Sequence, residues 1–147
     1  MITGLPPGLE FKVLHVGVVV PSFEAAIESY CDLFGYKVIS GPFEDPIQKV
    51  RVVFLAMSDT DAAQIELIAP LAEDSPVQSM LKKGSGGAYH LCLETADLDA
   101  ALEHAAANGC IVLCQPVPAV AFGGRSIAWI YTPARQLFEL LEAKAAG

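Results

Sequence analysis

Hydrophobic residues along this chain form short continuous runs and stripes with helical spacing. Residues 13–20, VLHVGVVV, are rich in valine and predict a buried strand. From Phe23 to Phe34 apolar residues recur three and four apart, which predicts a helix that Ser22 caps and Gly35 ends. The apolar runs 36–40, 50–57 and 63–70 predict three more strands, with a loop at 41–46 and a turn at 58–61. The first half therefore reads β-α-β-β-β.

The second half of the chain repeats this order. Residues 88–95, AYHLCLET, predict a strand, and 96–109 predict a helix that Asp97 caps and Gly109 ends. The runs 110–116, 125–132 and 136–143 predict the remaining strands, with a loop at 117–124 between the first and second of these. We therefore expect one domain over residues 1–147, with module one at about 11–70, a linker helix at about 71–87 and module two at about 88–143.

Composition and charge restrict the partners. The chain is 53% hydrophobic, enough for a substantial core, and its net charge is −8 with a pI of about 4.7. An acidic chain without basic clusters disfavours nucleic acid and anionic membranes as partners. The start of the chain lacks the pattern of a signal peptide, so we expect a cytoplasmic protein. The four cysteines form no CxxC pattern, and we expect them to be reduced.

The repeat pairs the residues that could carry chemistry. Placing HVGVVVPSFEAAI over HLCLETADLDAAL brings His15 onto His90, and placing QIELI over LFELL brings Glu66 onto Glu139. Both glutamates lie within apolar strands, where an unpaired carboxylate is costly to bury. A lone histidine in such a strand is more often an ordinary core residue, but the paired recurrence favours a shared role. His104, the third histidine, has no counterpart.

Alternation along the strands points the two glutamates away from their apolar neighbours. If the halves pack about a pseudo-two-fold axis, two imidazoles and two carboxylates converge in one cleft. Such a mixed nitrogen and oxygen site suits a divalent first-row metal with positions left open for water or substrate.

These features resemble the vicinal oxygen chelate superfamily, also called the glyoxalase/bleomycin resistance/dioxygenase superfamily. The resemblance covers the chain from Val13 onward, and within the superfamily the chain is most similar to the methylmalonyl-CoA epimerase group. The stretches that carry this similarity are QIELIAPLAEDSPVQSMLKKGSGGAYH (64–90) and FGGRSIAWIY (122–131). The resemblance implies an α+β fold, in which two tandem βαβββ modules form a partly open, cleft-lined β-barrel.

The resemblance also implies a function. His15, Glu66, His90 and Glu139 would hold a divalent ion, Co, Ni, Mn or Zn, in an epimerase or racemase acting on an acyl thioester such as methylmalonyl-CoA. The substrate would be carried by CoA or by a protein. Glu139 is the first candidate and Glu66 the second for the base that removes the α-proton.

Several positions depart from the group, including residues 131–136, where its members tend to have a histidine and glycines. Its members often carry a second histidine where Tyr89 stands, and some carry a carboxylate base near Val52. Arg125 and Gly124 are candidates for substrate binding, although an exposed turn is an equal alternative.

Other functions remain open at this point. A glyoxalase I-like lyase, acting on a thiol adduct of a 2-oxoaldehyde, would share the same four-ligand pattern. A metal-free module that sequesters a small molecule would have an incomplete ligand set. A ring-cleaving dioxygenase is disfavoured, because those members bind iron with two histidines and one glutamate. We expect a homodimer.

Overall fold

A computed structural model describes residues 4–57, 62–84 and 86–144 of the chain. The expected turn at 58–61 lies outside the described residues. The described elements, in chain order, are β1 (Lys12–Val19), α1 (Phe23–Phe34), β2 (Lys37–Asp45), β3 (Val50–Ala56), β4 (Gln64–Pro70), α2 (Gln78–Lys83), β5 (Gly87–Thr95), α3 (Leu98–Ala107), β6 (Ile111–Pro118), a 3-10 turn (Val120–Phe122), β7 (Ser126–Tyr131) and β8 (Leu137–Glu142). We call β1 to β4 the first half and β5 to β8 the second half.

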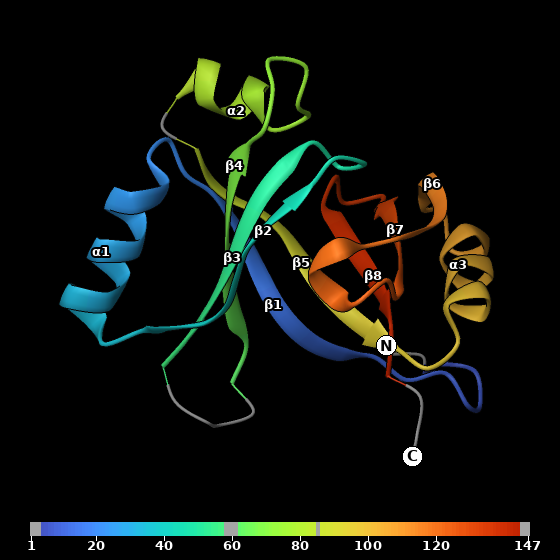
Figure 1. Cartoon of the computed structure of the whole chain (residues 1–147). Helices are drawn as coiled ribbons and strands as arrows, with labels where there is room; N and C mark the ends of the chain where they lie inside the picture. The colour runs from blue at the N-terminus through green and yellow to red at the C-terminus, as the bar shows by residue number, and fades with distance from the viewer. Residues whose placement is uncertain (1–3, 58–61, 85, 145–147) are drawn as a thin grey trace.

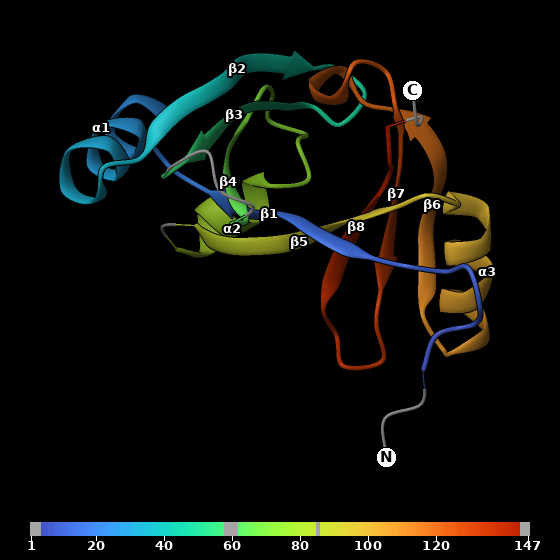
Figure 2. The ribbon, with the colours of Figure 1, turned by 90° about the horizontal axis from the view of Figure 1, so that it is seen from below.

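All the strands join in one curled sheet. Its eight strands run in the order β2-β3-β4-β1-β5-β8-β7-β6, so β1 and β5 meet at the centre and β2 and β6 form the free edges. β1 pairs in antiparallel fashion with β5, and each of them pairs in parallel with the last strand of its own half, β4 or β8. The α+β arrangement of two βαβββ units is therefore confirmed, as an open curled sheet (Figures 1 and 2).

The two long helices cover opposite wings of the sheet on its outer side (Figure 1). Ser22 and Asp97 accept hydrogen bonds from the backbone N–H groups of Ala25 and Ala100, so both predicted caps are present. The helix α1 packs against β3 and β4, and α3 packs against β7 and β8. None of the helices in the described ranges is long and apolar enough to cross a membrane. Because the helices occupy the outer side, the inner side remains free to form a site.

One predicted boundary was wrong. The loop expected at 41–46 is strand as far as Asp45, because β2 continues through a register shift between Ser40 and Phe43. Gly41, with φ of 92°, lies in that irregularity. β2 is an edge strand, and Pro42 has no partner on β3. The N–H group that proline lacks is therefore not needed for strand pairing. The extension brings the β2–β3 turn into the wall of the central cleft.

Candidate metal centre

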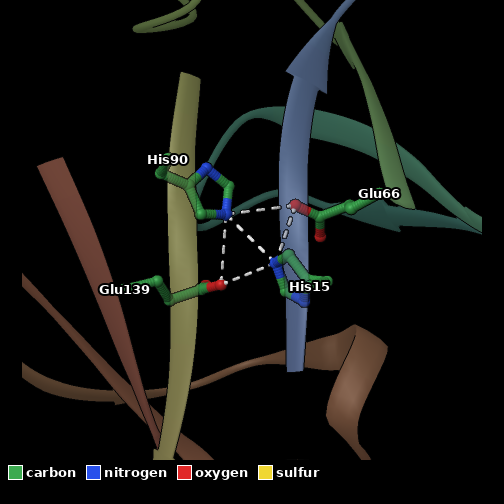
Figure 3. A group of neighbouring side chains, drawn as sticks. All are labelled: His15, Glu66, His90 and Glu139. Carbon is green, nitrogen blue, oxygen red and sulfur yellow. Dashed lines mark hydrogen bonds and ion pairs between the residues drawn. The ribbon is translucent and has the colours of Figure 1, made fainter. Parts of the chain in front are cut away.

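Four adjacent strands supply the four side chains that the repeat singles out. Glu66 comes from β4, His15 from β1, His90 from β5 and Glu139 from β8, and these are neighbours at the middle of the sheet. The apolar neighbours of the glutamates point the other way, Leu67 toward α1 and Leu140 toward α3. Figure 3 shows the four side chains turned toward one another across the inner side. The convergence predicted from the repeat is present.

The atoms of this group lie close to a common point. The Nε2 atoms of His15 and His90 are 3.1 Å apart. Glu66 Oε1 lies 3.3 Å from His15 Nε2 and 3.4 Å from His90 Nε2. Glu139 Oε1 lies 3.2 and 3.4 Å from the same two nitrogens. One donor atom from each residue falls within 4.8 Å of all the others.

The chemistry of the group fits a cation. All four residues are buried, with exposed fractions between 0% and 6%. Glu139 Oε1 has no partner in hydrogen-bonding geometry despite its short distances to the imidazoles. Two buried carboxylates facing two imidazole nitrogens are costly unless something positive lies between them. Two nitrogen and two oxygen donors around one point match a divalent first-row metal, and the group is a His/Glu metal-binding site.

The protonation of the group in the metal-free chain supports the same conclusion. Burial alone would lower the pKa of His15, but the carboxylates of Glu66 and Glu139 raise it to about 9. His90 has its pKa raised by the same carboxylates against the effect of burial. Burial would raise the pKa of Glu139, but the two imidazoles lower it to about 2. Without a metal, a proton on His15 therefore supplies positive charge between the carboxylates.

The two histidines have different surroundings. His15 is stacked on Phe122 at 5.9 Å between ring centroids and contacts Phe54 edge-on at 5.4 Å. His90 contacts Trp129 edge-on at 4.7 Å and Tyr89 at 5.3 Å. Aromatic contacts of this kind restrict the orientation of each imidazole.

Gly17 leaves room for the imidazole of His90. The register between the central strands sets Gly17 opposite His90, and a Cβ at Gly17 would lie 2.2 Å from His90 Cε1. That distance is far below van der Waals contact, so any side chain there would displace the imidazole. The absence of a side chain on β1 is therefore part of the geometry of the site.

A cavity of about 470 Å³ opens beside the metal group. It is within the size range of small-molecule sites. Most of its wall is apolar and comes from both halves; examples are Val52, Ile68, Val77, Phe122, Ile127 and Leu137. Among the ligand candidates, Glu66, His90 and Glu139 line it directly. A small molecule in this cavity would lie against the metal group in a mostly apolar environment.

Trp129 also lines this cavity. Its indole N–H donates a hydrogen bond of 3.1 Å to Gln48 Oε1, which joins β7 to the β2–β3 turn of the other half. Gln48 and Phe122 also line the cavity and were not singled out by the sequence. Their place in the cavity wall depends on contacts between distant segments of the chain, so no local pattern in the sequence marked them.

Arg125 and Gly124 lie apart from the cavity. The Arg125 guanidinium is paired with Glu94 at 3.3 Å and donates to the backbone carbonyls of Glu142 and Phe122. Arg125 lines a separate cavity with Glu94 and Lys12, and Gly124 lines neither. Val52, by contrast, is buried in the wall of the metal cavity, where it offers no group for proton transfer.

Comparisons with known proteins agree with this geometry. The sequence profile described as "Glyoxalase/Bleomycin resistance protein/Dioxygenase superfamily" matches residues 14–129. The chain is 33% identical over 121 residues to an ethylmalonyl-CoA/methylmalonyl-CoA epimerase of Cereibacter sphaeroides, covering 82% of this chain and 87% of that protein. It is 30% identical to the mitochondrial methylmalonyl-CoA epimerase of Dictyostelium discoideum, covering 82% and 70%.

Solved structures give the same result. The methylmalonyl-CoA epimerase of Mycobacterium tuberculosis superposes with a TM-score of 0.81 at 28% identity, covering 91% of this chain and 89% of that one. A variant of the Streptomyces coelicolor methylmalonyl-CoA epimerase, in complex with 2-nitronate-propionyl-CoA, superposes with a TM-score of 0.78 at 28% identity and covers 91% and 98%.

Proposed function

This chain belongs to the glyoxalase/bleomycin resistance protein/dioxygenase superfamily, in its methylmalonyl-CoA epimerase group, and we propose that it is a metal-dependent epimerase of an acyl thioester such as methylmalonyl-CoA. The observation that carries the proposal is the buried group of His15, Glu66, His90 and Glu139 beside an apolar cavity. The acyl-CoA names of the relatives supply the substrate class.

The metal is proposed to be Co, Ni, Mn or Zn, because imidazole and carboxylate donors suit these ions. Held by these four residues, it would supply Lewis-acid polarisation of the substrate carbonyl. Apolar side chains form most of the cavity wall, so charge interactions within it are stronger than in bulk water.

The proton transfer falls to the carboxylates. Glu139 is the first candidate for the base: it lines the cavity beside the metal group, and to accept the α-proton it would have to loosen from the metal or act through its second oxygen. The α-carbon–hydrogen bond breaks, the proton moves to a carboxylate oxygen, and the electron pair delocalises onto the carbonyl. Return of a proton to the other face inverts the centre. Glu66, which also lines the cavity, is the second candidate.

Deuterium exchange tests this function. Purified protein loaded with each metal in turn is incubated with one epimer of methylmalonyl-CoA in D₂O, and both inversion and deuterium at the α-carbon are followed by NMR. We expect exchange and inversion in the wild type and neither in His90→Ala. Metal uptake without exchange would exclude this epimerase activity. Failure of the wild type to retain more metal than His90→Ala would favour the metal-free binding module.

A glyoxalase I-like lyase is the second candidate, because Glu66 gives this chain the four-ligand pattern that such enzymes share. Turnover of the hemithioacetal formed from a thiol and a 2-oxoaldehyde, without deuterium exchange into methylmalonyl-CoA, would identify the lyase activity. Substrate binding by Arg125 and Gly124 and assembly as a homodimer stay predictions. Arg125→Ala would raise the KM if the first of these is correct.

A further inference from the structure

Tyr89 enters the cavity because of an irregularity in β5. The register pairs Gly17 with His90 and Val18 with Ala88, so Tyr89 is an extra residue without a partner on β1. Strict alternation would send the side chains of Tyr89 and His90 to opposite faces of the sheet. A bulge removes that alternation locally and redirects a side chain. Tyr89 and His90 consequently both line the metal cavity.

The ring of Tyr89 is held from several sides. It contacts His90 edge-on at 5.3 Å and Trp129 at 6.2 Å between centroids. It also packs against the buried cluster of the first half that contains Val52 and Ile68. The side chain therefore spans the space between the halves, beside His90 and against the cluster that contains Val52.

The hydroxyl of Tyr89 is available. Within the described ranges of the chain no group forms a hydrogen bond with it. A phenol has an ordinary pKa of about 10, so the hydroxyl carries a proton at neutral pH. It is a hydrogen-bond donor on a ring that contacts His90 of the metal group.

The other polar side chains of the cavity wall outside the metal group are partly occupied, weak donors or farther from the histidines. Asp45 accepts hydrogen bonds from the backbone N–H groups of Ile47 and Gln48. Gln48 accepts from Trp129 through Oε1 and keeps its amide N–H groups, but it lies in the β2–β3 turn. Cys114 offers only a thiol. The Tyr89 hydroxyl is the strong donor whose ring directly contacts a ligand candidate, His90.

We propose that Tyr89 is a substrate-binding residue of the cavity, whose hydroxyl donates a hydrogen bond to the acyl oxygen that becomes negatively charged when the α-proton leaves. The inference rests on the proposed epimerase function. A donor beside the base binds the enolate form more strongly than the ketone form, because its bond gains charge assistance as the proton leaves. The proton of Tyr89 stays on its own oxygen throughout, so the bond count of the reaction is unchanged.

Tyr89→Phe tests this role, because it removes only the hydroxyl and keeps the ring contacts. Two quantities are measured: the Kd of the carbanion mimic 2-nitronate-propionyl-CoA by calorimetry, and kcat and KM for methylmalonyl-CoA. We expect the Kd to rise and kcat to fall by about tenfold to hundredfold each, as for loss of a hydrogen bond to a charged group, with little change in KM. Binding and kcat within about twofold of wild type would overturn the proposal, since one such bond is worth more than that.

Three further variants make the result specific. Tyr36→Phe, a hydroxyl removed near α1 away from the cavity, should leave both quantities unchanged. Tyr89→His keeps a donor and should recover part of the lost mimic binding, whereas Tyr89→Leu should not. Equal impairment in all three Tyr89 variants, with normal metal content, would show that the ring rather than the hydroxyl matters and would overturn the proposal.

The wild type separates the two proposals. If it neither exchanges deuterium nor inverts methylmalonyl-CoA, the epimerase function fails and this inference fails with it. If the wild type is active and Tyr89→Phe is equally active, only the role of Tyr89 fails.

Discussion

Leu14 and Tyr89 hold equivalent places in the two halves, one residue before each histidine of the metal group. Each is the extra residue of a register shift between β1 and β5, and each turns inward. Leu14 packs into a buried cluster with Cys92 and Leu141. Tyr89 instead lines the cavity with a hydroxyl that no described residue binds.

The histidines that follow Leu14 and Tyr89 also differ in whether they line the cavity. His15 is enclosed by Phe54 and Phe122, with no exposed surface, and does not line the cavity. His90 lines the cavity and contacts Tyr89 and Trp129. The pseudo-symmetric repeat therefore builds an asymmetric site, in which His90 lines the cavity and His15 does not. Repetition explains where the ligand candidates are, and departures from it explain which of the two histidines faces the cavity.

Removal of either histidine should have the largest effect. His15→Ala and His90→Ala should each reduce metal affinity by more than about 100-fold, beyond the usual cost of changing an outer-shell residue. Epimerisation should fall by about a thousandfold or more, because a metal contributes several kcal/mol to such a reaction. Metal content by mass spectrometry, with His104→Ala as control, checks this. Loss of metal from only one variant would show that the two histidines do not contribute equally to metal binding.

The next largest effect concerns the residues that follow the histidines by two. Gly17 lies opposite His90, and Cys92 lies opposite His15. Gly17→Ala should lower metal affinity by about tenfold to hundredfold, because its Cβ would meet His90 Cε1 at 2.2 Å. Cys92→Ala, which shortens a side chain at the equivalent place, should change it little. Metal titration measures both, and equal losses would contradict the asymmetry inferred here.

The pH dependence of metal binding tests the protonation of the group. The metal binds neutral imidazole, whereas the pKa of His15 is raised to about 9 in the metal-free chain. Raising the pH from 7 removes the competing proton, so affinity should rise by about tenfold per pH unit for each proton displaced and level off above about 9. Calorimetry in buffers of different ionisation enthalpy counts the released protons. Affinity that does not vary with pH would contradict the raised pKa values.

The smallest effect concerns the link between the halves. Outside the metal group, the Trp129–Gln48 bond is the one side-chain hydrogen bond that joins the halves in the ranges the structure describes. Gln48→Ala should lower the free energy of unfolding by about 0.5–1.5 kcal/mol and leave metal affinity unchanged. Gln115→Ala, at an exposed glutamine of β6, is the control in urea unfolding. A lower metal affinity in Gln48→Ala would mean that the link also sets the geometry of the site.

Much of the fold and of the site was predictable because the relevant signals are local or repeated. Runs of apolar residues and capping residues gave the elements, including the caps Ser22 and Asp97. The repeat paired His15 with His90 and Glu66 with Glu139, and alternation within each strand gave the face on which Glu66 and Glu139 lie. For these four side chains to converge, the two halves need only pack against each other, and their apolar surfaces favour that packing.

The sequence by itself thus determined the elements and the four converging side chains, because each depends on the period of a strand or helix. Only the tertiary structure decided which neighbours complete the site. Alternation alone would place the side chains of Tyr89 and His90 on different faces of the sheet. The bulge in β5 instead brings both to the cavity. The pairing of Arg125 with Glu94 and the position of Trp129 beside His90 likewise depend on contacts between distant strands. Register shifts and contacts between strands arise from packing across the whole sheet, and no local pattern encodes them.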